Sequence, residues 1–234
     1  MMVTCQNRTF DLRGDAAACA FVLASTQFNT WLGRMDERFV ITAIEVQSVD
    51  KRFDGGLLFA KLRAEVTDPE GNRIPGSVFL RGDAVAVFIV LHDGTRDWVV
   101  LTTQPRFPVG VFESVEIPAG MMDDRGSFAG TAAREVQEET GLVINHERLT
   151  LLDEFAPSGG GSDEFIKLYS YEAAMPPGEI AALQGRLAGA HHEHERMSVL
   201  LVPLDELPQH TKDIKALLAY GCYHRWRMEG RRSR

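Results

Sequence analysis

Three glutamates, Glu135, Glu138 and Glu139, lie within one five-residue stretch in the second half of the chain. Like charges three or four residues apart on a helix repel each other, at a cost of about 0.2–0.5 kcal/mol per pair. A solvated acidic face is the ordinary explanation of such a cluster. The alternative is a metal site, because carboxylates at this spacing suit Mg²⁺ or Mn²⁺, ions that bridge protein oxygens to substrate phosphates.

A short helix over residues 128–140 is predicted to carry these glutamates. Ser127 before it is a typical N-cap residue, and Gly141 after it suits the left-handed position that ends many helices. At about 100° per residue, the carboxylates gather on one arc of the helix and the small or apolar side chains on another. The second arc holds Ala129, Ala132, Ala133, Val136 and Thr140. We therefore expect the carboxylates to converge on one side of the helix.

The segment from residue 120 to residue 142 resembles the signature of the Nudix hydrolases, G-x5-E-x7-R-E-U-x-E-E-x-G-U, in which U is an aliphatic residue. Gly120 begins the match, and the run REVQEETGL from residue 134 ends it at the same spacing. Gly126 stands where the signature has its first glutamate, and this is the one departure from the pattern.

Further segments are similar to the plant-type ADP-sugar pyrophosphatases of the Nudix group. They are PAGMMDD, IPGSVFLRG, TTQPRFPVG and GGGSDEF, and the likeness covers roughly residues 15–225. It implies an α/β fold, in which an α/β/α sandwich around a mixed sheet is preceded by a small antiparallel β domain. It also implies a homodimer in which the N-terminal domains contribute to the neighbouring active site.

The resemblance and the chemistry of carboxylates together imply a site for Mg²⁺, or Mn²⁺ in its place. Glu135 and Glu139 are expected to bind the ion directly, together with the main-chain carbonyl of Ala119. Glu138 is expected to bind it or to support a residue that does. Arg134 is expected to orient a neighbouring carboxylate through charge-assisted hydrogen bonds. Such ions neutralise diphosphate oxygens and lower the pKa of a bound water that attacks phosphorus.

Four other charged residues are candidates for contact with the substrate or for catalysis. Arg81 and Arg106 lie in segments similar to those that bind phosphates or the terminal sugar, although each is equally open to interpretation as a surface residue. Glu116 is expected to bond sugar hydroxyls or adenine, or else to complete a strand end. Glu164 is expected to act as a general base or an extra metal ligand, and the alternative is an exposed Asp-Glu pair in a hairpin loop.

Composition and charge restrict the class of protein. The chain has 234 residues, 44% of them hydrophobic and 25% charged, as expected for a globular protein with a large core. Its net charge of -8 argues against nucleic acid as the main partner and means that an anionic substrate needs cations. Three scattered cysteines, with no signal-like or membrane-spanning run, favour the cytoplasm. The run HHEHE from residue 191 is expected to be a solvated loop, because zinc sites need a second cluster of Cys or His.

Two domains are predicted, a β-rich domain over residues 1–80 and a Nudix domain over residues 81–234. A helical pattern lies within residues 10–35, and strand-like segments follow it, with turn residues at 68–72. The unbroken apolar run AVAVFIVL predicts a strand buried on both faces, followed by the turn His-Asp-Gly-Thr.

The predicted function is Mg²⁺-dependent hydrolysis of the diphosphate bond of an ADP-sugar, such as ADP-glucose or ADP-ribose, to AMP and a sugar phosphate. Nudix hydrolysis of another dinucleotide stays open, for example NADH, flavin dinucleotide or diadenosine polyphosphate. A third alternative is an inactive sensor of nucleotide sugars, since Gly126 departs from the signature. The retained Glu135 and Glu139 argue against a sensor, which has little need for a cluster of repelling charges.

Overall fold

The computed structural model describes residues 1–122, 127–188 and 197–232. Gly126 and the HHEHE run at residues 191–195 lie outside the described residues. The predictions made for these two segments therefore stay predictions.

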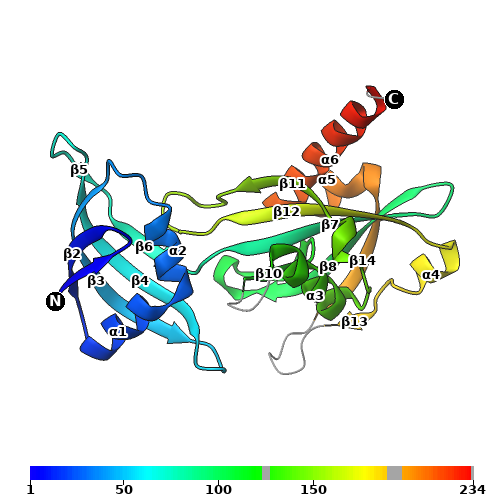
Figure 1. The fold of residues 1–234 in the computed structure, drawn as a ribbon. Coiled ribbons are helices and arrows are strands. Elements are labelled where there is room, and N and C mark those ends of the chain that lie inside the picture. The colour runs from blue at the N-terminus through cyan, green and yellow to red at the C-terminus, as the bar shows by residue number, and fades with distance from the viewer. Residues whose placement is uncertain (123–126, 189–196, 233–234) are drawn as a thin grey trace. The chain divides into compact units, whose positions relative to one another are not determined.

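Contacts within the chain divide it into two units (Figure 1). Unit 1 comprises Met1–Asp83 and Ala156–Phe165, and unit 2 comprises Ala84–Phe155 and Ile166–Arg234. The segment Ala156–Phe165, which the sequence-based division counts with the second domain, has most of its contacts in unit 1.

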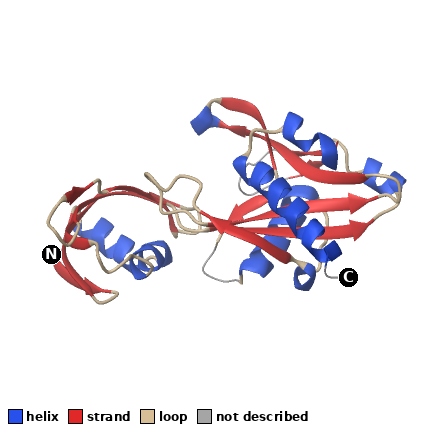
Figure 2. Ribbon diagram, turned by 90° about the horizontal axis from the view of Figure 1, so that it is seen from above, coloured by secondary structure: helices blue, strands red, loops and turns tan. Residues whose placement is uncertain are grey.

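Unit 1 is built on a six-stranded sheet and two helices. The strand order is β1-β2-β3-β4-β5, and β6 pairs with β4. Figure 2 shows this sheet curving around the two helices near the N-terminus. One core fills the space between them, with Phe10, Phe28 and Leu62 among its buried residues. The elements are β1 (Met2–Cys5), β2 (Arg8–Arg13), α1 (Ala16–Ala24), α2 (Thr26–Gly33), β3 (Val40–Lys51), β4 (Leu57–Thr67), β5 (Arg73–Ile74) and β6 (Ser77–Leu80).

The helices predicted within residues 10–35 are confirmed as α1 and α2. Helix α1 begins at Ala16, where the Asp15 carboxylate accepts the Ala18 N–H, and the strand β2 before it, which ends at Arg13, was not predicted. β2 also pairs with β3 in parallel, although the other strand pairs of this sheet are antiparallel as predicted. Parallel strands need a long crossover connection, and α1 and α2 supply it.

Unit 2 contains a mixed eight-stranded sheet, as predicted. Its order is β11-β12-β7-β8-β14-β13, with β10 paired to β7 and β9 to β8, and β7 and β12 are parallel. The strands are β7 (Ala84–His92), β8 (Asp97–Arg106), β9 (Val111–Glu116), β10 (Ala119–Met121), β11 (Thr150–Phe155), β12 (Ile166–Ala174), β13 (Leu187–Ala188) and β14 (Met197–Pro203). The α-helices are α3 (Phe128–Thr140), α4 (Pro177–Ala181), α5 (Leu207–His210) and α6 (Ile214–Arg232), and the 3₁₀ helices are η1 (Phe107–Val109), η2 (His146–Arg148) and η3 (Leu204–Glu206).

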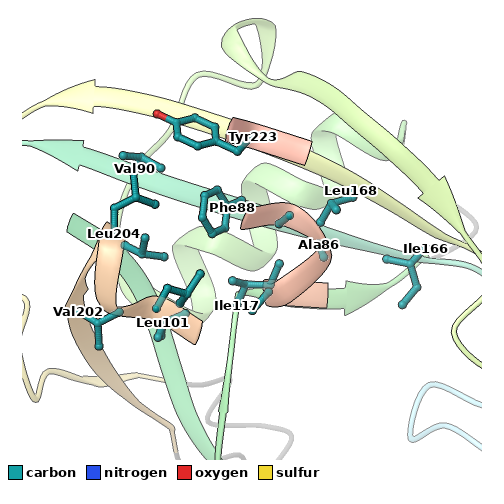
Figure 3. Packing of buried hydrophobic residues seen from close by; sticks show 14 of the residues in the cluster. Ala86, Phe88, Val90, Leu101, Ile117, Ile166, Leu168, Val202, Leu204 and Tyr223 are labelled. Carbon is teal, nitrogen blue, oxygen red and sulfur yellow. The ribbon is translucent and has the colours of Figure 1, made fainter. Parts of the chain in front are cut away.

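Alternate residues of β7 pack into two different cores, so this strand is buried on both faces. Phe88 packs against Tyr223 of α6, with 5.4 Å between the ring centroids, as Figure 3 shows. Val87 faces the other way and shares a core with Val136 of α3. The helices α3 and α6 therefore cover opposite faces of the sheet, and the predicted α/β/α sandwich is confirmed.

Candidate active site

Helix α3 has the two ends that the sequence predicts. The Ser127 hydroxyl accepts the Gly130 N–H at 3.1 Å. At the other end Gly141 adopts a left-handed conformation, with φ 72°, and its N–H donates to the carbonyl of Gln137. Both caps satisfy main-chain groups that a helix otherwise leaves without partners, so α3 starts and stops where predicted.

The three glutamates of α3 differ in burial. Glu139 is buried, with 5% of its surface exposed, whereas Glu135 is half-buried and Glu138 is exposed. The helix packs on the sheet through Ala132 and Val136. Because successive residues lie about 100° apart, this packing turns Glu139 toward the protein and Glu138 toward solvent. The three carboxylates therefore do not share one environment, although the sequence predicts a common arc.

Two of the carboxylates meet the main chain at Ala119 and Gly120. The Glu139 Oε2 atom accepts the Ala119 N–H at 3.2 Å. The Glu135 carboxylate lies so close to Gly120 that a Cβ atom there would overlap it. Gly120 pairs with Val85 of β7, and a side chain at this level of the sheet would point to the face that α3 covers. The missing side chain of Gly120 therefore leaves the space in which Glu135 lies.

This pair of carboxylates fits a hard divalent cation. Such ions take oxygen ligands, and the carboxylates of Glu139, at the Ala119 N–H, and Glu135, at Gly120, are of the right kind. The carbonyl of Ala119, with waters or phosphate oxygens, could complete the shell. Arg134 lies next to them, with its Nη2 atom 3.4 Å from Oε1 of Glu135. In the part of the chain that the structure describes, no group of three or more His, Cys, Asp or Glu residues is gathered as a metal site. The candidate metal site therefore consists of two carboxylates, those of Glu135 and Glu139, and the Ala119 carbonyl, and does not include Glu138.

A second group of charges lies along the β8–β9 hairpin. Arg106 donates to both carboxylate oxygens of Glu116, at 2.8 and 3.0 Å, and the Lys215 ammonium lies 3.3 Å from one of them. Burial of Glu116 raises the pKa of its carboxyl, but the hydrogen bond from Arg106 and the positive charges of Lys215 and Arg106 outweigh burial and bring that pKa to about 2. Two predicted substrate contacts, Arg106 and Glu116, are thus brought together.

Two further predicted residues, Arg81 and Glu164, come together within unit 1. The Arg81 Nε atom lies 3.4 Å from Oε1 of Glu164. The neighbouring Asp163 accepts the main-chain N–H groups of Arg81 and Gly82, at 2.7 and 3.1 Å. Asp163 and Glu164 are 6% and 8% exposed, so the alternative of an exposed Asp-Glu pair is wrong.

A comparison of the sequence with models of protein families shows which family the chain belongs to. The family model of the NUDIX domain matches residues 81–220, which is more than half of the chain. The chain belongs to the Nudix family. The matched residues include all of β9, β10 and α3, and therefore the candidate metal site.

Two curated proteins and one solved structure agree with this Nudix assignment. The chain is 36% identical over 225 residues to Nudix hydrolase 14, chloroplastic, of Arabidopsis thaliana, over 88% of this chain and 72% of that protein. It is 32% identical over 108 residues to the ADP-ribose pyrophosphatase of Bacillus subtilis, over 46% of this chain and 55% of that protein. A crystal structure of an ADP compounds hydrolase has a TM-score of 0.61 at 16% identity, over 85% of this chain and 98% of that chain. The structural match confirms the predicted Nudix fold.

The location of this Nudix protein in the cell stays a prediction. No helix of the described residues is long and apolar enough to cross a membrane. The sequence favours the cytoplasm, while the Arabidopsis relative is named as a chloroplast protein.

Sequence reasoning missed three residues that contact predicted site residues or their neighbours: Lys215, Asp163 and Asp213. Lys215 contacts Glu116, which is 99 positions away, and Asp163 bonds the main chain of Arg81, which is 82 positions away. Asp213 accepts a hydrogen bond from the Lys215 N–H at the start of α6. An acidic residue before a helical segment is a recognisable N-cap signal, but it does not reveal which distant strand the residue meets.

The Glu116 group makes part of the stability depend on pH. Its folded pKa of about 2 lies below the ordinary 4.5, so its stabilising contribution is complete above about pH 4.5 and is lost as the pH falls toward 2. A shift of this size corresponds to roughly 3 kcal/mol. Between about pH 6 and about pH 3, we expect the free energy of unfolding of the wild type to fall more steeply than that of Glu116→Gln, as measured by urea denaturation.

A matched control for this measurement is Glu147→Gln, which changes an exposed glutamate of the same unit. The control is expected to keep the wild-type dependence on pH. Identical slopes for wild type and Glu116→Gln would mean that Arg106 and Lys215 do not lower the pKa of Glu116.

Proposed function

We propose that this Nudix protein is a Mg²⁺-dependent diphosphatase that cleaves an ADP-sugar, such as ADP-ribose or ADP-glucose, into AMP and a sugar phosphate. The main support is the position of two carboxylates, Glu135 and Glu139, at the main chain of Ala119 and Gly120. The name of the Bacillus relative, ADP-ribose pyrophosphatase, points to the same chemistry.

In this proposal Glu135, Glu139 and the Ala119 carbonyl hold Mg²⁺, or Mn²⁺ in its place. When bound, the ion neutralises the diphosphate oxygens and lowers the pKa of a water molecule. In the reaction, the oxygen of a water molecule would form a bond to one phosphorus as the bond from that phosphorus to the bridging oxygen breaks. The proton released by the water would pass to the proposed general base, Glu164. One product phosphate therefore carries the oxygen of water and the other keeps the bridging oxygen.

Other residues of the chain have proposed roles in orientation and proton transfer. Arg134 orients Glu135, from which it is 3.4 Å distant, and the exposed Glu138 supports the metal site. Arg106 binds a phosphate or the terminal sugar, because Glu116 fixes its guanidinium while 40% of the side chain remains exposed. In unit 1, Glu164 is the proposed general base, and Arg81 lies close enough to orient it or to bind a phosphate.

The test is AMP release from ADP-ribose, ADP-glucose, UDP-glucose, NADH and diadenosine polyphosphates, with Mg²⁺ and with a chelator. We expect AMP from the ADP-sugars only when Mg²⁺ is present. Faster cleavage of NADH or a diadenosine polyphosphate would favour the other dinucleotides as substrates. Binding of ADP-ribose without AMP release from any compound would leave only the sensor. The proposed homodimer is tested separately by the mass of the protein in solution.

A further inference from the structure

Three side chains at the start of α6 hold the strand that leads into the candidate metal site. Thr211, Asp213 and Lys215, which we call the α6 clasp, occupy alternate positions between the end of α5 and the first turn of α6. Each of them contacts one of the consecutive residues Val115, Glu116 and Ile117.

The contacts of the α6 clasp resemble those of a neighbouring strand. The Thr211 hydroxyl donates to the carbonyl of Val115 at 2.5 Å, and the Asp213 carboxylate accepts the N–H of Ile117 at 3.2 Å. In an extended chain these two main-chain groups point to the same side, where a paired strand would bond them. The clasp therefore satisfies one edge of β9, while β8 pairs with the other.

Ion pairs connect two members of the α6 clasp, Asp213 and Lys215, to each other and to Glu116. The Lys215 ammonium lies 2.8 Å from the Asp213 carboxylate and 3.3 Å from that of Glu116. The side chains of Asp213 and Lys215 are 5% and 15% exposed, and Thr211 is 3% exposed. Breaking a buried pair of this kind leaves a charge without compensation, so the group resists rearrangement.

The chain held by the α6 clasp continues directly into the candidate metal site. Ile117 is followed by Pro118, whose ring restricts the main chain and whose carbonyl accepts the Val87 N–H of β7 at 2.9 Å. The next residue, Ala119, donates to Glu139. One residue, Pro118, whose ring fixes its φ, therefore separates Ile117 from the residue whose carbonyl is proposed to bind the metal.

We propose that Thr211, Asp213 and Lys215 are positioning residues, which fix the Ala119 main chain relative to Glu139 so that the site binds its metal tightly. This inference rests on the proposed function. It assigns the α6 clasp no contact with substrate, so loss of the Thr211 hydroxyl, which bonds the Val115 carbonyl, should change metal binding and the rate and leave substrate affinity at saturating metal unchanged.

The experiment compares Thr211→Val, which removes the hydroxyl and keeps the shape, with Thr211→Ser, which restores the hydroxyl. Lys215→Met is a second variant, and Thr150→Val in β11 is the matched control. Mn²⁺ binding to each protein without substrate is measured by electron paramagnetic resonance, and Glu139→Gln identifies the site. The concentration of Mg²⁺ at half-maximal kcat is measured alongside.

We expect Thr211→Val and Lys215→Met to weaken Mn²⁺ binding and to raise the required Mg²⁺ concentration about 10-fold. KM for ADP-ribose at saturating metal should stay unchanged in Thr211→Val, because the Thr211 hydroxyl bonds the Val115 carbonyl. Thr211→Ser and Thr150→Val should stay within about 2-fold of the wild type, well below that effect. Lower thermal stability in Thr211→Val and Lys215→Met with unchanged metal binding would overturn the proposal, as would a wild type without a Mn²⁺ site that depends on Glu139. Wild-type Mn²⁺ binding without cleavage of any ADP-sugar would overturn the proposed function alone.

Discussion

Replacing Glu139 with glutamine is expected to lower kcat/KM for an ADP-sugar by about 10²-fold or more. Glutamine has the shape of glutamate and can still accept the Ala119 N–H, which lies 3.2 Å from Oε2 in the wild type. The negative charge is lost, and with it the attraction for a divalent cation. Since Glu139 is 5% exposed, little room exists for another group to replace it.

Steady-state kinetics at several Mg²⁺ concentrations measure this effect, and circular dichroism and thermal unfolding establish that the variant is folded. The matched control is Glu147→Gln, the same change at an exposed glutamate of η2, and it should retain wild-type activity. Activity of Glu139→Gln close to that of wild type would show that the buried carboxylate does not bind the catalytic ion. The position of Glu139 would then be a structural feature only.

The second large effect is expected from Gly120→Ala, with a loss of about 10²-fold in kcat and little change in stability. The added Cβ would lie 2.5 Å from Cγ of Glu135, which real contacts do not allow. The overlapping atoms belong to the end of a flexible side chain, so Glu135 can move away without disturbing the sheet. Glu135 would then leave its position against residue 120, and the two carboxylates would no longer share one ion.

Steady-state kinetics and thermal unfolding of the same samples distinguish the effect of Gly120→Ala on kcat from its effect on stability. Gly178→Ala in α4 is the matched control, because a Cβ there meets no atom within 4 Å. The control is expected to match the wild type in both measurements. A variant Gly120→Ala that unfolds far more easily would mean that the sheet, rather than Glu135, absorbs the strain. Wild-type activity of Gly120→Ala would mean that catalysis does not require Glu135 to lie against residue 120.

The parts of the fold that the sequence predicts well are those with a local physical cause. Helix α3 was predicted with both of its ends, because the caps at Ser127 and Gly141 form hydrogen bonds with groups within one helical turn. The strand β7 was predicted from an apolar run, because burial on both faces leaves no polar position. The strand β2 was missed although Phe10 and Leu12 alternate with polar residues, because it has only six residues and a helical segment follows almost at once.

The same distinction holds for the candidate site: features with a local cause were predicted from the sequence, and features that depend on distant packing were not. The spacing of the glutamates and the resemblance to the Nudix signature indicated Glu135, Glu139 and Ala119. Their separation from the exposed Glu138 could not be predicted from residue types, because it depends on how α3 is rotated against β7 and β10. Periodicity describes which residues share an arc, and only packing decides which arc faces the protein.

Residue types at fixed short spacings were enough to predict the family, the helix that carries the carboxylates and the glycine beside them. The folded chain was needed to show that Arg106 and Lys215 share Glu116, and that Thr211 and Asp213 hold the strand before Ala119. Residue 213 is 96 positions from residue 117, so their contact follows from the topology that brings α6 to the edge of β9. Hydrogen bonds and ion pairs act only over a few ångströms, so such partners become visible when the chain is folded.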